Sequence, residues 1–116
     1  MAVLTKEQIL AAEDLPSETL RVKEWGGDVT VRTMTGAERD EYAIAISRLD
    51  EKQRTRNIRA RLLAMCVVND QGERLFGESD IEALGKKSIK AINRVFAAAQ
   101  RLNALTEADI EDLAKN

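Results

Sequence analysis

The chain has 116 residues, with 18 basic and 20 acidic side chains and a formal net charge of −2. This length predicts a single domain over 1–116, and the near balance of charge argues against bulk binding to nucleic acid or to an anionic membrane. Histidine is absent, cysteine occurs once, and no apolar run approaches the ~20 residues of a membrane span, so we expect a cytoplasmic, non-enzymatic protein without metal, cofactor or internal disulfide.

The first expected element is a short helix. Thr5 and Gln8 have the spacing of a capping box, in which each side chain bonds the backbone N–H of the other residue. The helix should run through Ala12. We expect Pro16 to end it, because proline disfavours helical geometry in the residue before it.

A β-hairpin is expected next. Apolar and polar residues alternate over 20–25 and again over 29–32, on either side of Gly26 and Gly27. Both glycines should supply the positive φ angles of a tight turn, so that a Gly27→Val substitution would strain it. Trp25, the single tryptophan, lies at the tip. It either anchors an interface or folds back over the chain's own helices, and the pattern leaves both interpretations open.

A helix over 36–49 should follow the hairpin almost without a linker. Thr35 and Glu38 form a second capping box at its start, so hairpin and helix should pack as one unit. The residues that should share its inward face are Tyr42, Ile46 and Leu49.

The middle of the chain is expected to be largely helical. Residues 50–57 are highly charged and could be a loop or a solvated helical bridge, and a long helix should cover 54–67. Its inward residues should be Ile58, Leu62 and Met65. The polar run over 69–72 predicts a turn, and 67–68 could pair with 74–76 in a second, very short hairpin.

Three further helices are expected towards the C-terminus. A short one should open at 79–82 and stop at Gly85, a typical residue just after a helix end. A long amphipathic helix should cover 88–103, and a short acidic helix should cover 106–113. The predicted fold class is therefore α+β and mostly helical, with an N-terminal β-hairpin followed by several amphipathic helices and no parallel sheet.

The helix over 88–103 carries most of the candidate interaction residues. We expect its apolar face and the Trp25 hairpin to mediate self-association, because isolated hairpins are marginally stable alone. The apolar face comprises Ile89, Ile92, Val95, Phe96, Ala99 and Leu102, and all of these but Ala99 are candidate interaction residues. A basic ridge comprises Lys87, Lys90, Arg94 and Arg101. This ridge could receive an acidic partner or the acidic segment 107–112, although ordinary amphipathicity is the favoured explanation.

Two other features bear on possible chemistry, a single thiol and a basic run. Cys66 lies among apolar residues, which favours a buried, inert thiol over a nucleophile. The basic run over 48–61 has no interleaved aromatic residues and forms no single track on a helical projection. A solvated face is therefore favoured there over a nucleic-acid groove.

The order of several short motifs resembles that of tail assembly chaperones from long-tailed phages and prophages. The motifs include LPSET at 15–19, EWGG at 24–27, TGAERD at 35–40, IEALGKKS at 81–88 and AQRLN at 99–103. The resemblance covers nearly the whole chain, and it rests on the order and spacing of the motifs more than on any one of them. The basic run over 48–61 matches no motif of the family.

The resemblance implies a non-catalytic function. Members of this family are thought to coat the tape measure protein in the host cytoplasm, to help recruit tail tube subunits, and to be absent from the mature virion. Coating a long partner with many copies also implies a homo-oligomer. Many members have a longer form made by a −1 ribosomal frameshift, and Ala-Lys-Asn at 114–116 can be encoded with the slippery heptamer A-AAA-AAC.

Two rival classes of function remain. The chain could be a nucleic-acid-binding regulator that uses 48–61, in which case DNA binding should weaken steeply with salt. It could also be a small structural head–tail or tail component of the virion, and it would then be recovered in purified particles.

Overall fold

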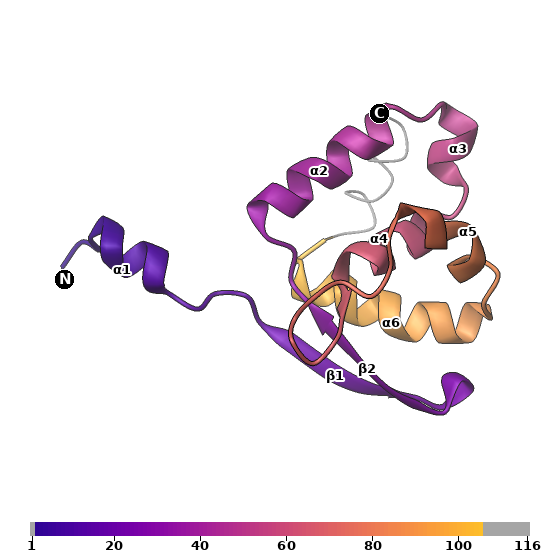
Figure 1. The fold of residues 1–116 in the computed structure, drawn as a ribbon, viewed down its shortest axis with the longest axis horizontal. Helices are drawn as coiled ribbons and strands as arrows, with labels where there is room; N and C mark the ends of the chain where they lie inside the picture. Colours follow the sequence, from indigo (N-terminus) through magenta and orange to yellow (C-terminus); the bar gives the residue numbers. More distant parts are fainter. Residues whose placement is uncertain (1, 106–116) are drawn as a thin grey trace.

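The computed structural model describes residues 2–105 and has an α+β fold (Figure 1). The helices are α1 (Lys6–Ala11), α2 (Gly36–Ser47), α3 (Glu51–Thr55), α4 (Ile58–Cys66), α5 (Ile81–Leu84) and α6 (Ile89–Leu102). The strands are β1 (Ser17–Val22), β2 (Gly27–Arg32) and β3 (Val67–Val68), and the 3₁₀ turns are η1 (Lys23–Trp25) and η2 (Glu78–Asp80). The predicted fold class is confirmed, while the helix expected over 106–113 lies outside the described residues.

The three strands form one antiparallel sheet in the order β1, β2, β3. β1 and β2 make the expected hairpin, and the hydroxyl oxygens of Thr19 and Thr30 are 2.8 Å apart across it. β3 joins the other edge of β2 through the pairs Thr30–Val68 and Val31–Val67. The hairpin is therefore part of a small sheet rather than an isolated ribbon, which local sequence patterns did not predict.

The hairpin turn corrects one sequence expectation. Residues 23–25, expected to extend the first strand, form η1, and Gly26 follows with a φ of 72°. Gly27 does not have a positive φ, because it is the first residue of β2 and pairs with Val22. The expectation of two left-handed glycines is therefore wrong for Gly27, and Gly26 alone uses the conformational freedom of glycine here.

The second hairpin is reduced to a turn and a single bridge. Asn69 Oδ1 accepts two backbone N–H bonds within the turn, at 2.9 and 3.0 Å, and Gly72 has a φ of 78°. The turn over 69–72 is therefore confirmed. Beyond it, one bridge joins Val68 to Arg74, and the longer pairing of β3 is with β2.

The N-terminal helix is shorter than expected. Thr5 and Gln8 form the expected capping box, but α1 ends at Ala11 and the chain is already extended at Ala12, ahead of Pro16. No residue of α1 is buried, and Figure 1 shows it standing apart from the rest of the fold. Because most helical stability in proteins comes from packing, a helix without a packed face stays short.

The middle of the chain forms two helices, so the charged stretch over 50–57, for which a loop and a helical bridge were both open, is mostly helical. α3 occupies the charged stretch, and a capping box between Asp50 and Gln53, which sequence reasoning overlooked, starts it. Asn57 then adopts a left-handed conformation with a φ of 59°, and α4 begins at Ile58. The expected helix over 54–67 is wrong at its N-terminal end, because one left-handed residue interrupts a right-handed helix.

The second predicted capping box is confirmed. Thr35 and Glu38 cap each other's backbone at the start of α2, and the Glu38 carboxylate also accepts two bonds from Arg32, at 2.8 and 3.0 Å. These bonds hold the start of α2 against β2. Among the expected inward residues, Tyr42, Ile46 and Leu62 are buried, whereas Leu49, Ile58 and Met65 are partly buried.

Gly85 follows the end of α5, as expected, but it does not adopt the left-handed conformation typical of a glycine there. It ends α5, but its φ of −64° is an ordinary right-handed value. A Cβ atom at this position would collide with the side-chain amide of Asn57, at the start of α4. The same Asn57 amide donates through Nδ2 to Glu82 at 3.3 Å. Glycine here therefore leaves room for the Asn57 side chain and does not serve as a left-handed helix end.

The core lies between the sheet and two helices. α6 packs against β1, β2 and α4. The large buried side chains of the core are mostly aliphatic, because aromatic residues make up only 3% of the chain. The buried side chains include Val22 and Val31 from the sheet, Leu62 and Leu63 from α4, and Ile92, Val95 and Phe96 from α6.

Candidate functional site

The basic ridge of α6 is partly paired within the molecule. Arg94 Nε donates to both carboxylate oxygens of Glu24, at 2.9 and 3.2 Å. Arg101 Nη2 donates to both of Glu18, at 2.7 and 2.6 Å. The hydrogen bond from Arg94 holds the pKa of the Glu24 carboxyl below its ordinary value of 4.5. The acids that meet this ridge therefore come from the hairpin, while the segment 107–112 lies outside the described residues.

Most of the apolar face of α6 is inside the core. Ile92, Val95 and Phe96 are buried and Leu102 is partly buried, so these side chains chiefly hold the fold together. Ile89 was expected on the same face, but its side chain is not buried. It is 62% exposed, because α6 starts beyond the edge of the core. A role for this face in self-association, Ile89 included, stays a prediction.

One open groove lies between the starts of α4 and α6, and we term it the α4–α6 groove. Its volume is about 320 Å³. The large apolar residues that line it are Ile58, Ile89 and Ile92, and the charged residues are Arg59 and Lys87. No acidic residue lines this groove in the described part of the chain. The α4–α6 groove is therefore both apolar and basic.

A second open groove, the Trp25 groove, has a volume of about 370 Å³. Its lining residues are Trp25, Phe76, Asp80, Ala83, Leu84 and Lys87. The Trp25 side chain is partly buried and packs against the core. It therefore folds back over the domain, as one of the two open interpretations held, and it still lines a surface that a partner could reach.

The two grooves are neighbours, because Lys87 lines both of them. Lys87 lies in the link between α5 and α6, and Lys90 follows it, exposed, in the first turn of α6. The sequence pattern pointed to Trp25, Lys87 and Ile89, but it did not indicate that Arg59 and Phe76 line these grooves. No local pattern marks those two, because the packing of distant elements brings them to the grooves.

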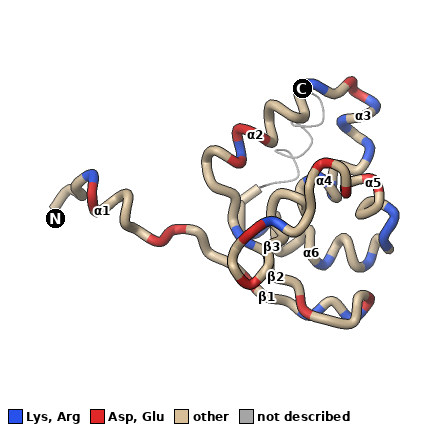
Figure 2. The backbone as a smooth tube through the Cα atoms, viewed as in Figure 1, with Lys and Arg blue, Asp and Glu red and all other residues tan. Residues whose placement is uncertain are grey.

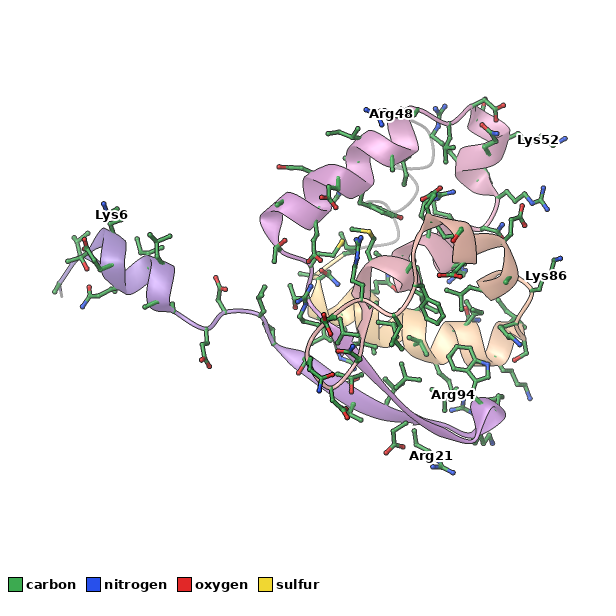
Figure 3. The ribbon with its side chains drawn as sticks, viewed as in Figure 1. Lys6, Arg21, Arg48, Lys52, Lys86 and Arg94 are labelled. Atoms are coloured by element: carbon green, nitrogen blue, oxygen red, sulfur yellow. The ribbon has the colours of Figure 1, made fainter. Side chains whose placement is uncertain are left out.

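The basic run over 48–61 is largely engaged within the molecule. The internal partners are the Leu49 carbonyl for Arg54, Glu82 for Arg56, Glu78 for Arg61 and the Phe96 ring for Arg59. Only 11% of the Arg61 side chain is exposed, and Arg48 and Lys52 project separately from the surface (Figure 3). These scattered orientations do not make the continuous basic track that a nucleic-acid groove needs.

Comparison with known proteins identifies the family of this chain. A family model for phage tail assembly chaperones matches residues 5–116. The chain belongs to the phage tail assembly chaperone family. The solved structure of the bacteriophage HK97 tail assembly chaperone has a similar fold, with a TM-score of 0.57 and 18% sequence identity, covering 83% of this chain and 94% of that chain. No curated protein sequence matches. The family resemblance seen in the motifs is confirmed.

Tail assembly chaperones are a non-enzymatic kind of protein. Cys66 is buried as expected, and burial raises the pKa of its thiol to about 11, so the thiol is protonated at neutral pH. Burial also raises the pKa of Tyr42 to about 12. Within residues 2–105, no cluster of acidic, histidine or cysteine side chains could hold a metal ion, and no helix could span a membrane.

Proposed function

We propose that this chain binds amphipathic helical segments of the tape measure protein and thereby promotes assembly of the tail tube. Membership of the tail assembly chaperone family supports the general role. The observation that carries the finer proposal is the Trp25 groove, an open surface whose lining includes the side chains of Trp25 and Phe76. An exposed apolar groove on a small domain is the kind of surface that receives the apolar face of a helix.

The composition of the Trp25 groove suits an amphipathic helix. Trp25, Phe76 and Leu84 offer apolar contact, and tryptophan is among the residues that most often dominate the energy of an interface. Asp80 and Lys87 place one charge of each sign in the lining. A helix would bury its apolar stripe in the groove and keep its polar side in water. Many weakly bound copies along one long partner would gain through effective concentration.

Tryptophan fluorescence tests this binding directly, because Trp25 is the only tryptophan of the chain. A tape measure fragment without tryptophan, added to the full chain, should shift the Trp25 emission to shorter wavelength as the groove is covered. The shift should saturate with added fragment. If the emission spectrum stays constant at fragment concentrations at which the two proteins co-elute in size-exclusion chromatography, the fragment binds elsewhere and not at Trp25.

A matched pair of alanine substitutions tests the groove in cells. Ala83 lines the Trp25 groove on the exposed side of α5, and Ala43 is an exposed position of α2 outside both grooves. In co-expression, Ala83→Arg should lower the soluble fraction of the tape measure protein, and Ala43→Arg should leave it as in the wild type. Equal solubility with both variants would count against the Trp25 groove as the binding site.

Recruitment of tail tube subunits belongs to the same proposal, through a longer form of the chain made by a −1 frameshift in the host cytoplasm. The candidate site at 114–116 lies outside the described residues. The gene sequence tests this part: a slippery heptamer followed by an open −1 frame is expected. Mass spectrometry of purified virions should find none of this chain, whereas a structural component would be retained.

A further inference from the structure

Three lysines around the link between α5 and α6 form no ion pair within residues 2–105. Lys86, Lys87 and Lys90 are all exposed. Figure 2 shows the basic residues of this link together at one end of the fold, and Figure 3 places Lys86 at its outer edge. Several arginines, by contrast, are paired with carboxylates of the same chain, namely Arg32, Arg56, Arg61, Arg94 and Arg101. The three lysines therefore present positive charge that the described chain leaves to solvent.

Lys87 borders both open grooves. The other charged lining residue is Arg59 in the α4–α6 groove and Asp80 in the Trp25 groove. Asp80 Oδ2 already accepts a hydrogen bond from the Gly77 backbone N–H at 2.8 Å. The Arg59 guanidinium lies over the Phe96 ring, 4.6 Å from its centre. Within residues 2–105, Lys87 is thus the charged lining residue of these two grooves whose side chain has no partner.

Apolar side chains lie on both sides of Lys87. Leu84, in α5, lines the Trp25 groove together with Trp25. Ile89, in the first turn of α6, lines the α4–α6 groove and is 62% exposed. A helix laid across the α5–α6 link would therefore meet an apolar surface, a lysine and a second apolar surface in turn. Residues three or four apart share one face of a helix, so an acidic residue one turn from an apolar stripe matches that order.

The lining of the α4–α6 groove favours a protein segment over a phosphate backbone. No aromatic residue of the described chain lines it, so it offers no surface on which bases could stack. Its large lining residues other than Arg59 and Lys87 are isoleucines, which gain nothing from contact with phosphate. A carboxylate beside an aliphatic stripe satisfies the lysine and the isoleucines together.

We propose that the tape measure helix bound in the Trp25 groove carries acidic residues along one edge of its apolar stripe, and that Lys87 recognises this edge where the two grooves meet. The inference rests on the proposed function and deepens it, because it names the chemistry of the bound segment. Lys87 then selects acid-edged helices among the amphipathic helices that the Trp25 groove would otherwise accept. A basic edge is rejected, because like charges brought together at an interface repel.

Two designed helical peptides test this selection. Both lack tryptophan and share the same leucine stripe, but one carries glutamate along an edge of the stripe where the other carries lysine. Each is titrated into the full chain at low salt, and Trp25 emission reports binding. The glutamate peptide should bind about three- to tenfold more tightly, since each exposed ion pair contributes little. The ratio of the two affinities should approach one at high salt.

A matched pair of charge reversals assigns the selection to one residue. Lys87→Glu is compared with Lys52→Glu, because Lys52 is exposed on α3 and lines neither groove. Both variants change the net charge by the same amount, and both should keep the wild-type melting temperature. In Lys87→Glu, the affinity ratio of the glutamate to the lysine peptide should fall to about one or lower. In Lys52→Glu, the ratio should remain that of the wild type.

The outcomes separate this inference from the proposed function. Equal affinities of the two peptides for the wild type, or a ratio that Lys87→Glu leaves unchanged, would overturn the charge selection and keep the Trp25 groove as a helix site. If neither peptide shifts the Trp25 emission, the groove takes no helix and both proposals lose their site. A short single-stranded oligonucleotide is titrated as well. If it binds more tightly than the glutamate peptide and Lys87→Glu abolishes its binding, Lys87 serves phosphate and the inference is wrong.

The natural partner provides an independent readout. Overlapping peptides that tile the tape measure protein are tested for binding to the wild type and to Lys87→Glu. Peptides that bind the wild type and lose affinity for the variant should carry Asp or Glu within one helical turn of an apolar stripe. Bound peptides without such acidic residues would reject the selection by Lys87, while their binding would still support the proposed function.

Discussion

Arg94 and Glu24 are separated by 70 residues in the chain and are joined by a two-oxygen hydrogen bond in the fold, at 2.9 and 3.2 Å. Glu24 lies in η1 at the hairpin tip, and Arg94 lies in the middle of α6. Figure 3 shows Arg94 beside that tip. Because Trp25 follows Glu24 directly, this ion pair also holds one wall of the Trp25 groove in place.

Acid should weaken this attachment in a defined direction. The pKa of Glu24 is lowered from 4.5 in the folded protein, chiefly by the Arg94 hydrogen bond, so its contribution to stability is complete above about pH 4.5 and is lost as the pH falls through the folded value. Glu24→Gln should therefore lower the melting temperature more at pH 7 than at pH 3. Calorimetry of both proteins across this range provides the measurement.

A matched control for this pH experiment is Glu7→Gln, which changes an exposed carboxylate on α1. Its melting temperature should follow that of the wild type at both pH values. High salt should also shrink the effect of Glu24→Gln at pH 7, because Glu24 and Arg94 are partly open to solvent. A pH-independent difference between wild type and Glu24→Gln would mean that the carboxylate charge does not hold the tip.

Gly85→Ala should destabilise the protein although alanine fits its backbone angles. The added Cβ would displace the Asn57 amide and so break its bond to Glu82, which costs roughly 0.5–1.5 kcal/mol of unfolding free energy. Denaturant titration measures this cost. Gly36→Ala is the control, because nothing lies near its Cβ position. In an Asn57→Gly background the cost of Gly85→Ala should vanish, and a cost that persists there would reject this explanation.

The two glycines of the hairpin turn should respond differently to substitution. Gly26 has a φ of 72°, so Gly26→Ala should cost about 1 kcal/mol. Gly27 is extended in β2 with open space around its Cβ position, so Gly27→Val should change the free energy of unfolding by less than about 0.5 kcal/mol. Chemical denaturation compares them. A larger loss for Gly27→Val than for Gly26→Ala would place the turn one residue later.

Two isoleucines in one helix allow a direct comparison of core and surface. Ile92 is 5% exposed and Ile89 is 62% exposed. Ile92→Ala should lower the free energy of unfolding by about 2–5 kcal/mol, whereas Ile89→Ala should change it by about 0.5 kcal/mol or less in the monomer. Urea unfolding at low protein concentration checks both values. Similar losses from the two variants would show that Ile89 is packed within its own chain.

The sequence by itself determined the features that depend on residues close together in the chain. The capping boxes of Thr5 and Thr35, the Asn69 turn and the periodicity of α6 each rest on hydrogen bonds or side-chain spacing within a few positions. These local interactions favour one backbone conformation whatever the rest of the chain does. The family resemblance was also readable, because it depends on the order of such motifs.

The tertiary structure alone decided which of these elements meet. Ile89 and Ile92 have the same chemistry, and only the extent of the core under α6 leaves one exposed and buries the other. Phe76 reaches the Trp25 groove, and Glu24 reaches Arg94, through the packing of elements far apart in the chain. Such contacts have no local sequence signal, because they depend on how the sheet and helices exclude water together, and the candidate grooves are made of contacts of this kind.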